Sequence, residues 1–227
     1  MGGLAGWMLG FALGVLHSLE PDHLTAVSTL VVDGRGARRS AAVGAVWGLG
    51  HTLALLLLGG ALALLESRMP AWAARDFELA VAAMLIVLGL NAIRRAAREP
   101  AAGPFGVHAH GAHEHGHAHS GPHVHVGGWT LAWRPLLVGL VHGTAGSGAL
   151  TALVLAGLGT NLERLVYISL FGLGSTLGMA LLSGLAGLSL SRLALRPGLQ
   201  RGFTFAVGLL SAAVGVAWGW PLLGHPG

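Results

Sequence analysis

Cysteine and lysine are both absent from this chain of 227 residues, and only 10% of its residues are charged. Without cysteine there are no disulfide bonds, thiolate ligands or redox-active thiols, so a bound metal must take nitrogen and oxygen ligands. Soluble domains carry about 25% charged residues, so the low charge argues against that class. The 13 basic residues are all arginines that flank apolar segments. This placement indicates membrane topology and no nucleic-acid partner.

Apolar residues dominate what is present: 53% of the chain is hydrophobic, and it contains 38 glycines. A membrane-spanning helix needs about 20 mostly apolar residues. Six apolar runs of roughly that length occur, at 4–32, 40–65, 77–93, 135–159, 165–190 and 202–223. Many glycines suit helices that pack closely in a membrane. The sequence therefore predicts an all-α membrane protein with six transmembrane helices in contact with the lipid bilayer.

The arginines are distributed unevenly between the two sides of such a protein. Ten follow the first, third or fifth run: Arg35, Arg38, Arg39, Arg94, Arg95, Arg98, Arg134, Arg192, Arg196 and Arg201. Three lie in the other joints: Arg68, Arg75 and Arg164. Because arginine-rich joints stay in the cytoplasm, both termini are expected outside, with the joint between the third and fourth runs inside.

An internal repeat relates the two halves of the chain. Gly14-Val-Leu-His17 returns as Gly139-Leu-Val-His142, and Gly48-Leu-Gly-His-Thr-Leu53 returns as Gly172-Leu-Gly-Ser-Thr-Leu177. Each half has three runs, and since three is odd the halves must cross the membrane in opposite senses. The sequence thus predicts two inverted three-helix repeats, an architecture of secondary transporters that place their site near the membrane midplane.

The predicted repeats occupy 1–98 and 135–227, and a different kind of segment, 99–134, joins them. It holds eight histidines among glycine, alanine and proline: His108, His110, His113, His115, His117, His119, His123 and His125. The stretch 99–128 that holds them cannot bury a core, so we expect no fixed structure there in a metal-free state. Alternating histidines can gather a divalent metal loosely. The segment is predicted to be a cytoplasmic, metal-binding loop.

The first apolar run contains a polar stretch, His17-Ser-Leu-Glu-Pro-Asp-His23. Placing a charge at the bilayer centre costs about 3 kcal/mol or more, so ionisable residues there are functional candidates. Pro21 has no N–H to donate to the His17 carbonyl, and the helix is expected to break near it. Opened backbone in a membrane is tolerated around a wet cavity, where transporters hold ions. A polar helix end at the membrane surface is the alternative interpretation.

His51, in the second run, is the third intramembrane histidine and predicts a site shared with the first run. The predicted metal ligands are His17, Asp22, His23 and His51. Imidazole nitrogens with a carboxylate oxygen suit Ni²⁺, Co²⁺, Zn²⁺ or Fe²⁺. The second half brings no carboxylate near His142, so hydroxyl and backbone oxygens are expected from it. Candidates for a supporting layer or the ion path are Glu20, Thr52, His142, Thr144 and Ser175.

Several function classes fit intramembrane histidines. A secondary transporter of divalent metal ions fits best, because no phosphate-binding Gly-x4-Gly-Lys-Ser/Thr loop is present for ATP hydrolysis. An intramembrane zinc-dependent hydrolase would instead use its metal to activate water. A haem-binding membrane protein would use facing histidines, and an anion or sulfur-compound exporter of similar layout is a further alternative.

The stretch His17–His23 resembles the H-x4-D-H signature of the nickel/cobalt permeases, including the six-span members found beside urease genes. Gly50-His-Thr52 is similar to that family's second motif, and His142-Gly-Thr-Ala is a weaker echo of a later Asp-Thr-Ala motif. The histidine-rich loop is similar to that of the efflux branch. The resemblance implies transport of Ni²⁺ or Co²⁺ across a bacterial cytoplasmic membrane, with no enzymatic activity and no prosthetic group. A cytoplasmic metal chaperone or a urease or hydrogenase accessory protein is an implied partner. Import and export both remain open.

Overall fold

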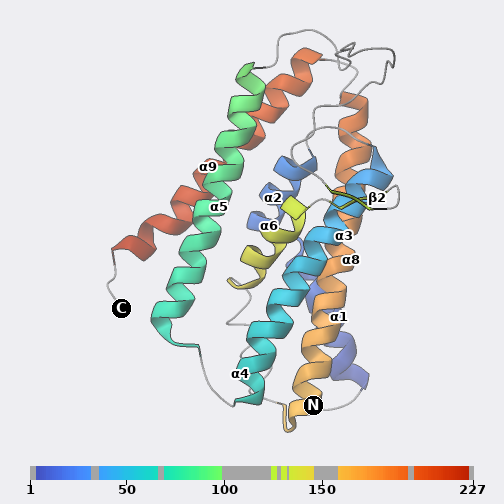
Figure 1. Cartoon of the computed structure of the whole chain (residues 1–227), viewed down its shortest axis with the longest axis vertical. Coiled ribbons are helices and arrows are strands. Elements are labelled where there is room, and N and C mark those ends of the chain that lie inside the picture. Colours follow the sequence, from blue (N-terminus) through green and yellow to red (C-terminus); the bar gives the residue numbers. More distant parts are fainter. Residues whose placement is uncertain are drawn as a thin grey trace.

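The computed structural model describes residues 4–31, 36–65, 69–98, 124–126, 129–131, 133–145, 158–193 and 197–224 (Figure 1). The elements are, in chain order, α1 (Leu4–His17), α2 (Pro21–Val31), α3 (Ala37–Ala54), η1 (Leu55–Gly59), α4 (Gly60–Leu64), α5 (Ala71–Arg98), β1 (Val124–Val126), β2 (Trp129–Leu131), α6 (Trp133–Gly143), α8 (Asn161–Leu193) and α9 (Pro197–Leu223). Here η1 is a π-helical stretch that continues α3 into α4.

Four helical segments are long and apolar enough to cross a membrane: Ala37–Leu62, Ala71–Arg98, Asn161–Arg192 and Gly198–Leu223. They correspond to the second, third, fifth and sixth apolar runs. The first run is divided between α1 and α2, while the fourth begins as α6 and continues outside the described residues. The chain is therefore a multi-pass, predominantly helical membrane protein, and four of the six predicted spans are continuous helices of sufficient length.

The long helices form two groups, and the short helices α2 and α6 lie between them (Figure 1). α5 packs along α9 in one group, and α1 and α3 pack along α8 in the other. α6 packs on α3, and α2 contacts α5, α8 and α9. The short helices α2 and α6 therefore lie between the two groups (Figure 1), and their polar residues Asp22, His23 and His142 are buried.

Close helix contacts at glycine hold the second group together. A Cβ added to Gly14 would overlap the carbonyl oxygen of Phe171, and one added to Gly139 would overlap that of Trp47. Only a residue without a side chain allows backbones to approach this closely in a membrane. α1 is thus fixed on α8, and α6 on α3, at the turns just before His17 and His142.

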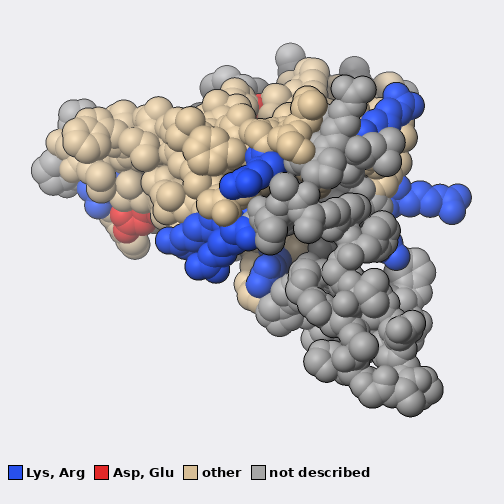
Figure 2. All heavy atoms as spheres, turned by 90° about the horizontal axis from the view of Figure 1, so that it is seen from above, with Lys and Arg blue, Asp and Glu red and all other residues tan. Residues whose placement is uncertain are grey.

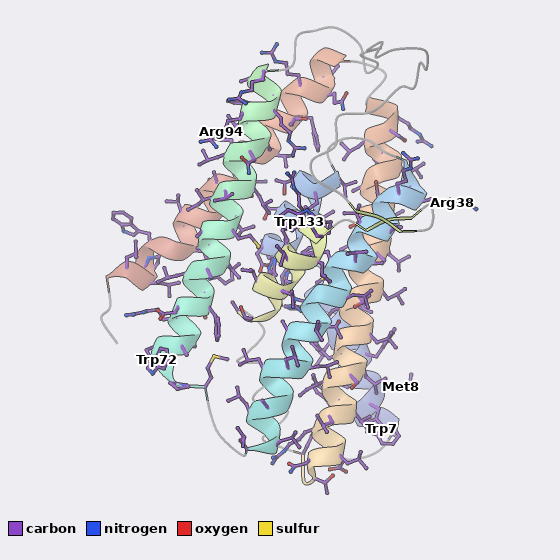
Figure 3. All side chains as sticks on the ribbon, in the orientation of Figure 1. Trp7, Met8, Arg38, Trp72, Arg94 and Trp133 are labelled. Atoms are coloured by element: carbon purple, nitrogen blue, oxygen red, sulfur yellow. The ribbon has the colours of Figure 1, made fainter. Side chains whose placement is uncertain are left out.

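Arg94 and two of the labelled tryptophans, Trp7 and Trp72, lie toward opposite ends of the molecule (Figure 3). Figure 2 looks onto the end at which α5 finishes with Arg95 and Arg98, and arginine side chains gather there. In Figure 3, Arg94 lies toward this end, whereas Trp7 and Trp72 lie toward the other. This polarity agrees with the uneven arginine distribution along the sequence.

A short antiparallel ladder lies in the predicted loop, where β1 pairs with β2 and Val124 stands opposite Leu131. The expectation of no fixed structure, made for 99–128, is wrong for β1, which lies within that range. Two glycines between β-forming segments are a hairpin signal, and that signal was present in the sequence. His125 lies in β1, and the other seven loop histidines lie outside the described residues.

Candidate metal centre

The break in the first apolar run places the site. α1 ends at His17, and tighter backbone bonds follow, from the Leu19 N–H to the Leu16 carbonyl and from the Glu20 N–H to the His17 carbonyl, both 3.0 Å. Pro21 then begins α2, a position that suits proline because the first helical N–H has no partner within the helix. The break lies where it was predicted. The His17 carbonyl, to which Pro21 cannot donate, accepts instead from the Glu20 N–H.

Three predicted ligands, His17, His23 and His51, lie close together in the structure. Their ring centroids are 4.4 Å apart for His17 and His23, 5.2 Å for His17 and His51, and 5.4 Å for His23 and His51. All three side chains are at most 5% exposed. They come from three different helices, α1, α2 and α3, so the cluster depends on tertiary packing.

Each of the two histidines on the broken stretch is paired with a carboxylate. His17 Nδ1 is 2.8 Å from Glu20 Oε1, and His23 Nδ1 is 3.1 Å from Asp22 Oδ1. A carboxylate that accepts a hydrogen bond from one ring nitrogen fixes the tautomer and leaves the other nitrogen as a metal ligand. Both rings therefore have Nε2 available for an ion. Glu20 is half-exposed and supports His17 from the edge of the site.

His142 joins this cluster from the other half of the chain. Its Nε2 lies 2.7 Å from Asp22 Oδ2, and its ring centroid is 4.0 Å from that of His23. The two oxygens of Asp22 are thus shared between a histidine of α2 and one of α6. His142 was among the residues predicted to support the site or line the ion path, and the packing of α6 on α3 places its imidazole beside Asp22.

Several buried imidazole nitrogens of the cluster have no hydrogen-bond partner, which is uncommon for buried polar atoms. Among the described residues, five such buried atoms have no hydrogen-bond partner: His17 Nε2, His23 Nε2, both ring nitrogens of His51, and His142 Nδ1. A buried polar group without a partner costs about 1–3 kcal/mol. Two overlapping sets of ligand atoms, each within 4.8 Å of one another, could hold a metal ion: His17, His23 and His51, and Asp22, His23 and His142.

The hydroxyl groups predicted to support the site or line the ion path form hydrogen bonds with backbone carbonyls or with one another. Thr52 Oγ1 donates to the Gly172 carbonyl at 2.8 Å and lies 2.9 Å from Thr176 Oγ1. Ser175 Oγ donates to the Gly14 carbonyl at 3.1 Å, and Thr144 Oγ1 donates to the Val141 carbonyl at 2.7 Å. Thr52 and Ser175 therefore join helices across the two halves.

Aromatic residues and apolar clusters flank the histidines on both sides. Phe171 packs with Leu55 and Ile168 in one apolar cluster. The ring centroid of Phe171 is 5.3 Å from that of His17. Trp47, in the larger cluster with Val27, Leu85 and Met179 among others, is fully buried with its ring centroid 5.6 Å from that of His23. Apolar residues thus lie beside the buried histidines of both α1 and α2.

A comparison over nearly the whole chain decides the family. The chain is 30% identical over 214 residues to the urease accessory protein UreH of Bacillus sp. (strain TB-90), an alignment that covers 92% of this chain and 87% of that protein. The chain belongs to the UreH family. No family model matches it, and no solved structure matches it.

Parts of two plant proteins are also similar to this UreH-family chain. The Arabidopsis thaliana chloroplast proteins FOR GROWTH AND FERTILITY 2 and 1 are 40% and 36% identical to it over 93 and 106 residues. These alignments cover 40% and 42% of this chain, and 25% and 28% of the plant proteins. The likeness to the plant proteins is therefore confined to a segment of each.

Proposed function

We propose that this UreH-family protein is a secondary transporter of Ni²⁺ or Co²⁺, with the ion bound by His17, Asp22, His23 and His51. One observation carries the proposal: four buried histidines around a carboxylate leave five ring nitrogens without partners inside a membrane protein. A divalent ion would give those nitrogens the partner they lack. Nitrogen with some oxygen suits Ni²⁺ and Co²⁺, and Zn²⁺ and Fe²⁺ are also accepted by such ligands.

The site has the two properties that an ion needs when it leaves water. Imidazole nitrogens replace its hydration shell, and Asp22 offsets part of its charge in a medium where an uncompensated charge is unfavourable. Glu20 and Asp22 hold His17 and His23 by hydrogen bonds to Nδ1. The rings are therefore oriented before the ion arrives.

Six spans arranged as two inverted repeats would supply the movement that transport requires. Reciprocal contacts support this architecture: Gly14 meets the Phe171 carbonyl and Gly139 meets that of Trp47, and these four residues are matched by the sequence repeat. Thr52 and its repeat mate Thr176 touch one another. Rocking of the halves about this contact would expose the ion to each side in turn.

The same architecture gives a proposed placement in the cell. Repeats 1–98 and 135–227 would lie in the bacterial cytoplasmic membrane with both termini outside and the loop 99–134 in the cytoplasm. The loop histidines would gather ions near the inner mouth of the transporter. The relative is described as a urease accessory protein, which supports a nickel ion as cargo and a urease accessory protein or metal chaperone as a partner.

The zinc-hydrolase alternative is less well supported by the geometry. A hydrolase needs an open coordination position that its substrate can reach. His17, Asp22, His23, His51 and His142 are at most 5% exposed, and apolar residues flank them. The relative is described as an accessory protein of an enzyme. Both points favour a carrier whose ion is enclosed and then released.

Metal accumulation in cells tests the proposed function. Cells that express the chain should differ in labelled Ni²⁺ or Co²⁺ content from cells that express His23→Ala at the same membrane level. A higher content would mean import, and a lower content would mean export. If cells with the wild-type chain and cells with His23→Ala contain the same amount of Ni²⁺, and also the same amount of Co²⁺, the proposal is overturned.

A further inference from the structure

The two overlapping sets of ligand atoms come from different parts of the chain. His17, His23 and His51 come from α1, α2 and α3, which all lie in the first half of the chain. Asp22 and His23 come from α2, but His142 comes from α6 in the second half. One set is therefore internal to a half, and the other joins the halves.

A single residue, His23, is common to both sets. Its ring centroid lies 5.4 Å from that of His51 and 4.0 Å from that of His142, while His51 and His142 are 6.3 Å apart. Because His23 is closer to each of the other two rings than they are to one another, an ion bound to it can exchange His51 for His142 without leaving the imidazole that it already has. The shared ligand also means that one ion at a time can occupy the pair.

Asp22 changes its role between the two positions. With the ion among the three histidines, its oxygens serve as hydrogen-bond partners of His23 at 3.1 Å and His142 at 2.7 Å. With the ion among Asp22, His23 and His142, the carboxylate becomes a ligand. An ion in this second position replaces the contact between Asp22 and His142, which is a direct polar link between α2 and α6.

We propose that the site holds one ion in two successive positions, a first formed by His17, His23 and His51 and a second formed by Asp22, His23 and His142, and that His142 is the ligand of the second half that receives the ion. This inference rests on the proposed transport function. It makes His142 a binding residue, and it ties the passage of the ion between positions to the interface across which the halves would move.

Equilibrium binding and transport with purified full-length protein in nanodiscs and proteoliposomes test this proposal. The probe is labelled Ni²⁺. The variant His23→Ala removes a ligand from both positions, so the binding that remains in it comes from the histidine-rich loop and serves as the baseline. Above that baseline, the wild type, His51→Ala and His142→Ala should each bind one ion per chain. The His51→Ala/His142→Ala double variant, which removes a ligand from both positions, should bind Ni²⁺ at least tenfold more weakly than either single variant. Each single variant should transport at least tenfold more slowly than the wild type.

Two further variants separate ligation from folding. His142→Gln retains a polar side chain near Asp22 without an imidazole, and it should behave like His142→Ala. Ser211→Ala removes a buried hydroxyl that donates to the Leu85 carbonyl at 2.9 Å, far from the histidines in sequence, and it should bind and transport like the wild type.

The outcomes distinguish this proposal from the one on which it rests. If His142→Ala transports like the wild type, or if either single variant loses all binding above the baseline, the two-position site is wrong. Loss in a single variant would mean one site that needs all its ligands together. If the wild-type protein neither transports Ni²⁺ nor binds it above the baseline, the proposed function itself fails.

Discussion

Asp22 and His142 lie 2.7 Å apart although 120 residues separate them in the chain. The contact joins a helix that follows the break in the first apolar run to a helix that opens the second half. The other oxygen of Asp22 is 3.1 Å from His23 Nδ1, so this one carboxylate contacts two histidines of the cluster. Much of the behaviour expected of this protein follows from that double role.

Removal of the charge on Asp22 should be severe. Asp22→Asn keeps the shape of the side chain but withdraws the negative charge that offsets the ion and anchors two imidazoles. Loss of such a supporting group typically costs 10–100-fold in metal affinity, and we expect at least about 100-fold here, measured by labelled Ni²⁺ binding in nanodiscs above the His23→Ala baseline. Asp76→Asn, which changes an exposed carboxylate beside Arg75, should leave binding unchanged. Equal binding by Asp22→Asn and the wild type would contradict this role.

Glu20 should act through His17. Its Oε1 is 2.8 Å from His17 Nδ1, and its side chain is 43% exposed against 4% for that of His17. Glu20→Gln should weaken metal binding about tenfold by orienting the ring less firmly. His17→Ala should reduce transport much further, because it removes the ring itself. Glu78→Gln on α5 is the matched control in a transport assay. A Glu20→Gln variant as inactive as His17→Ala would instead indicate direct ligation by Glu20.

Several of these relationships could be predicted from sequence, and one could not. Pro21 within an apolar run indicated a break, and His17, Asp22 and His23 marked it as polar, because both signals are local. The arrival of His142 beside Asp22 depends on how α6 packs on α3 through Gly139. Such packing is a tertiary property, so the repeat indicated equivalence of His17 and His142 but no contact with the carboxylate.

The backbone carbonyl of His17 shows a second limit of sequence reasoning. The sequence showed that Pro21 has no N–H to donate to this oxygen, but it did not show which other group would bond to it. The chain instead closes the end of α1 with a bond from the Glu20 N–H at 3.0 Å. Helix ends commonly tighten in this way to satisfy their last carbonyls. Likewise, Thr52 and Ser175 matched a polar path in sequence, but their hydroxyls bond to carbonyls of facing helices.

Close packing at Gly14 should be essential for stability. A side chain there would overlap the Phe171 carbonyl, whereas Gly202 on α9 has nothing within 4 Å of an added Cβ. Overpacking typically costs about 1–3 kcal/mol, occasionally more. Gly14→Val should lower the midpoint of thermal unfolding in detergent by several degrees, and Gly202→Val should leave it nearly unchanged. Equal midpoints for the two variants would refute the close contact of α1 with α8.

The orientation in the membrane can be read with reporter fusions. A reporter that is active only outside the cytoplasm should be active when fused after Gly224 and silent when fused within 105–120, because arginines concentrate on the loop side of the protein. The opposite pattern would reverse the assignment of inside and outside. It would leave the metal site untouched, since the site does not depend on orientation.

Transport by purified protein tests the central claim most directly. Proteoliposomes that contain the wild-type chain and an internal Ni²⁺-sensitive dye should respond to external Ni²⁺, and those with His23→Ala, matched for protein content and for elution on size exclusion, should respond at the rate of protein-free vesicles. His23 is the decisive residue because both sets of ligand atoms include it. A His23→Ala protein that transports Ni²⁺ at the wild-type rate would contradict the account.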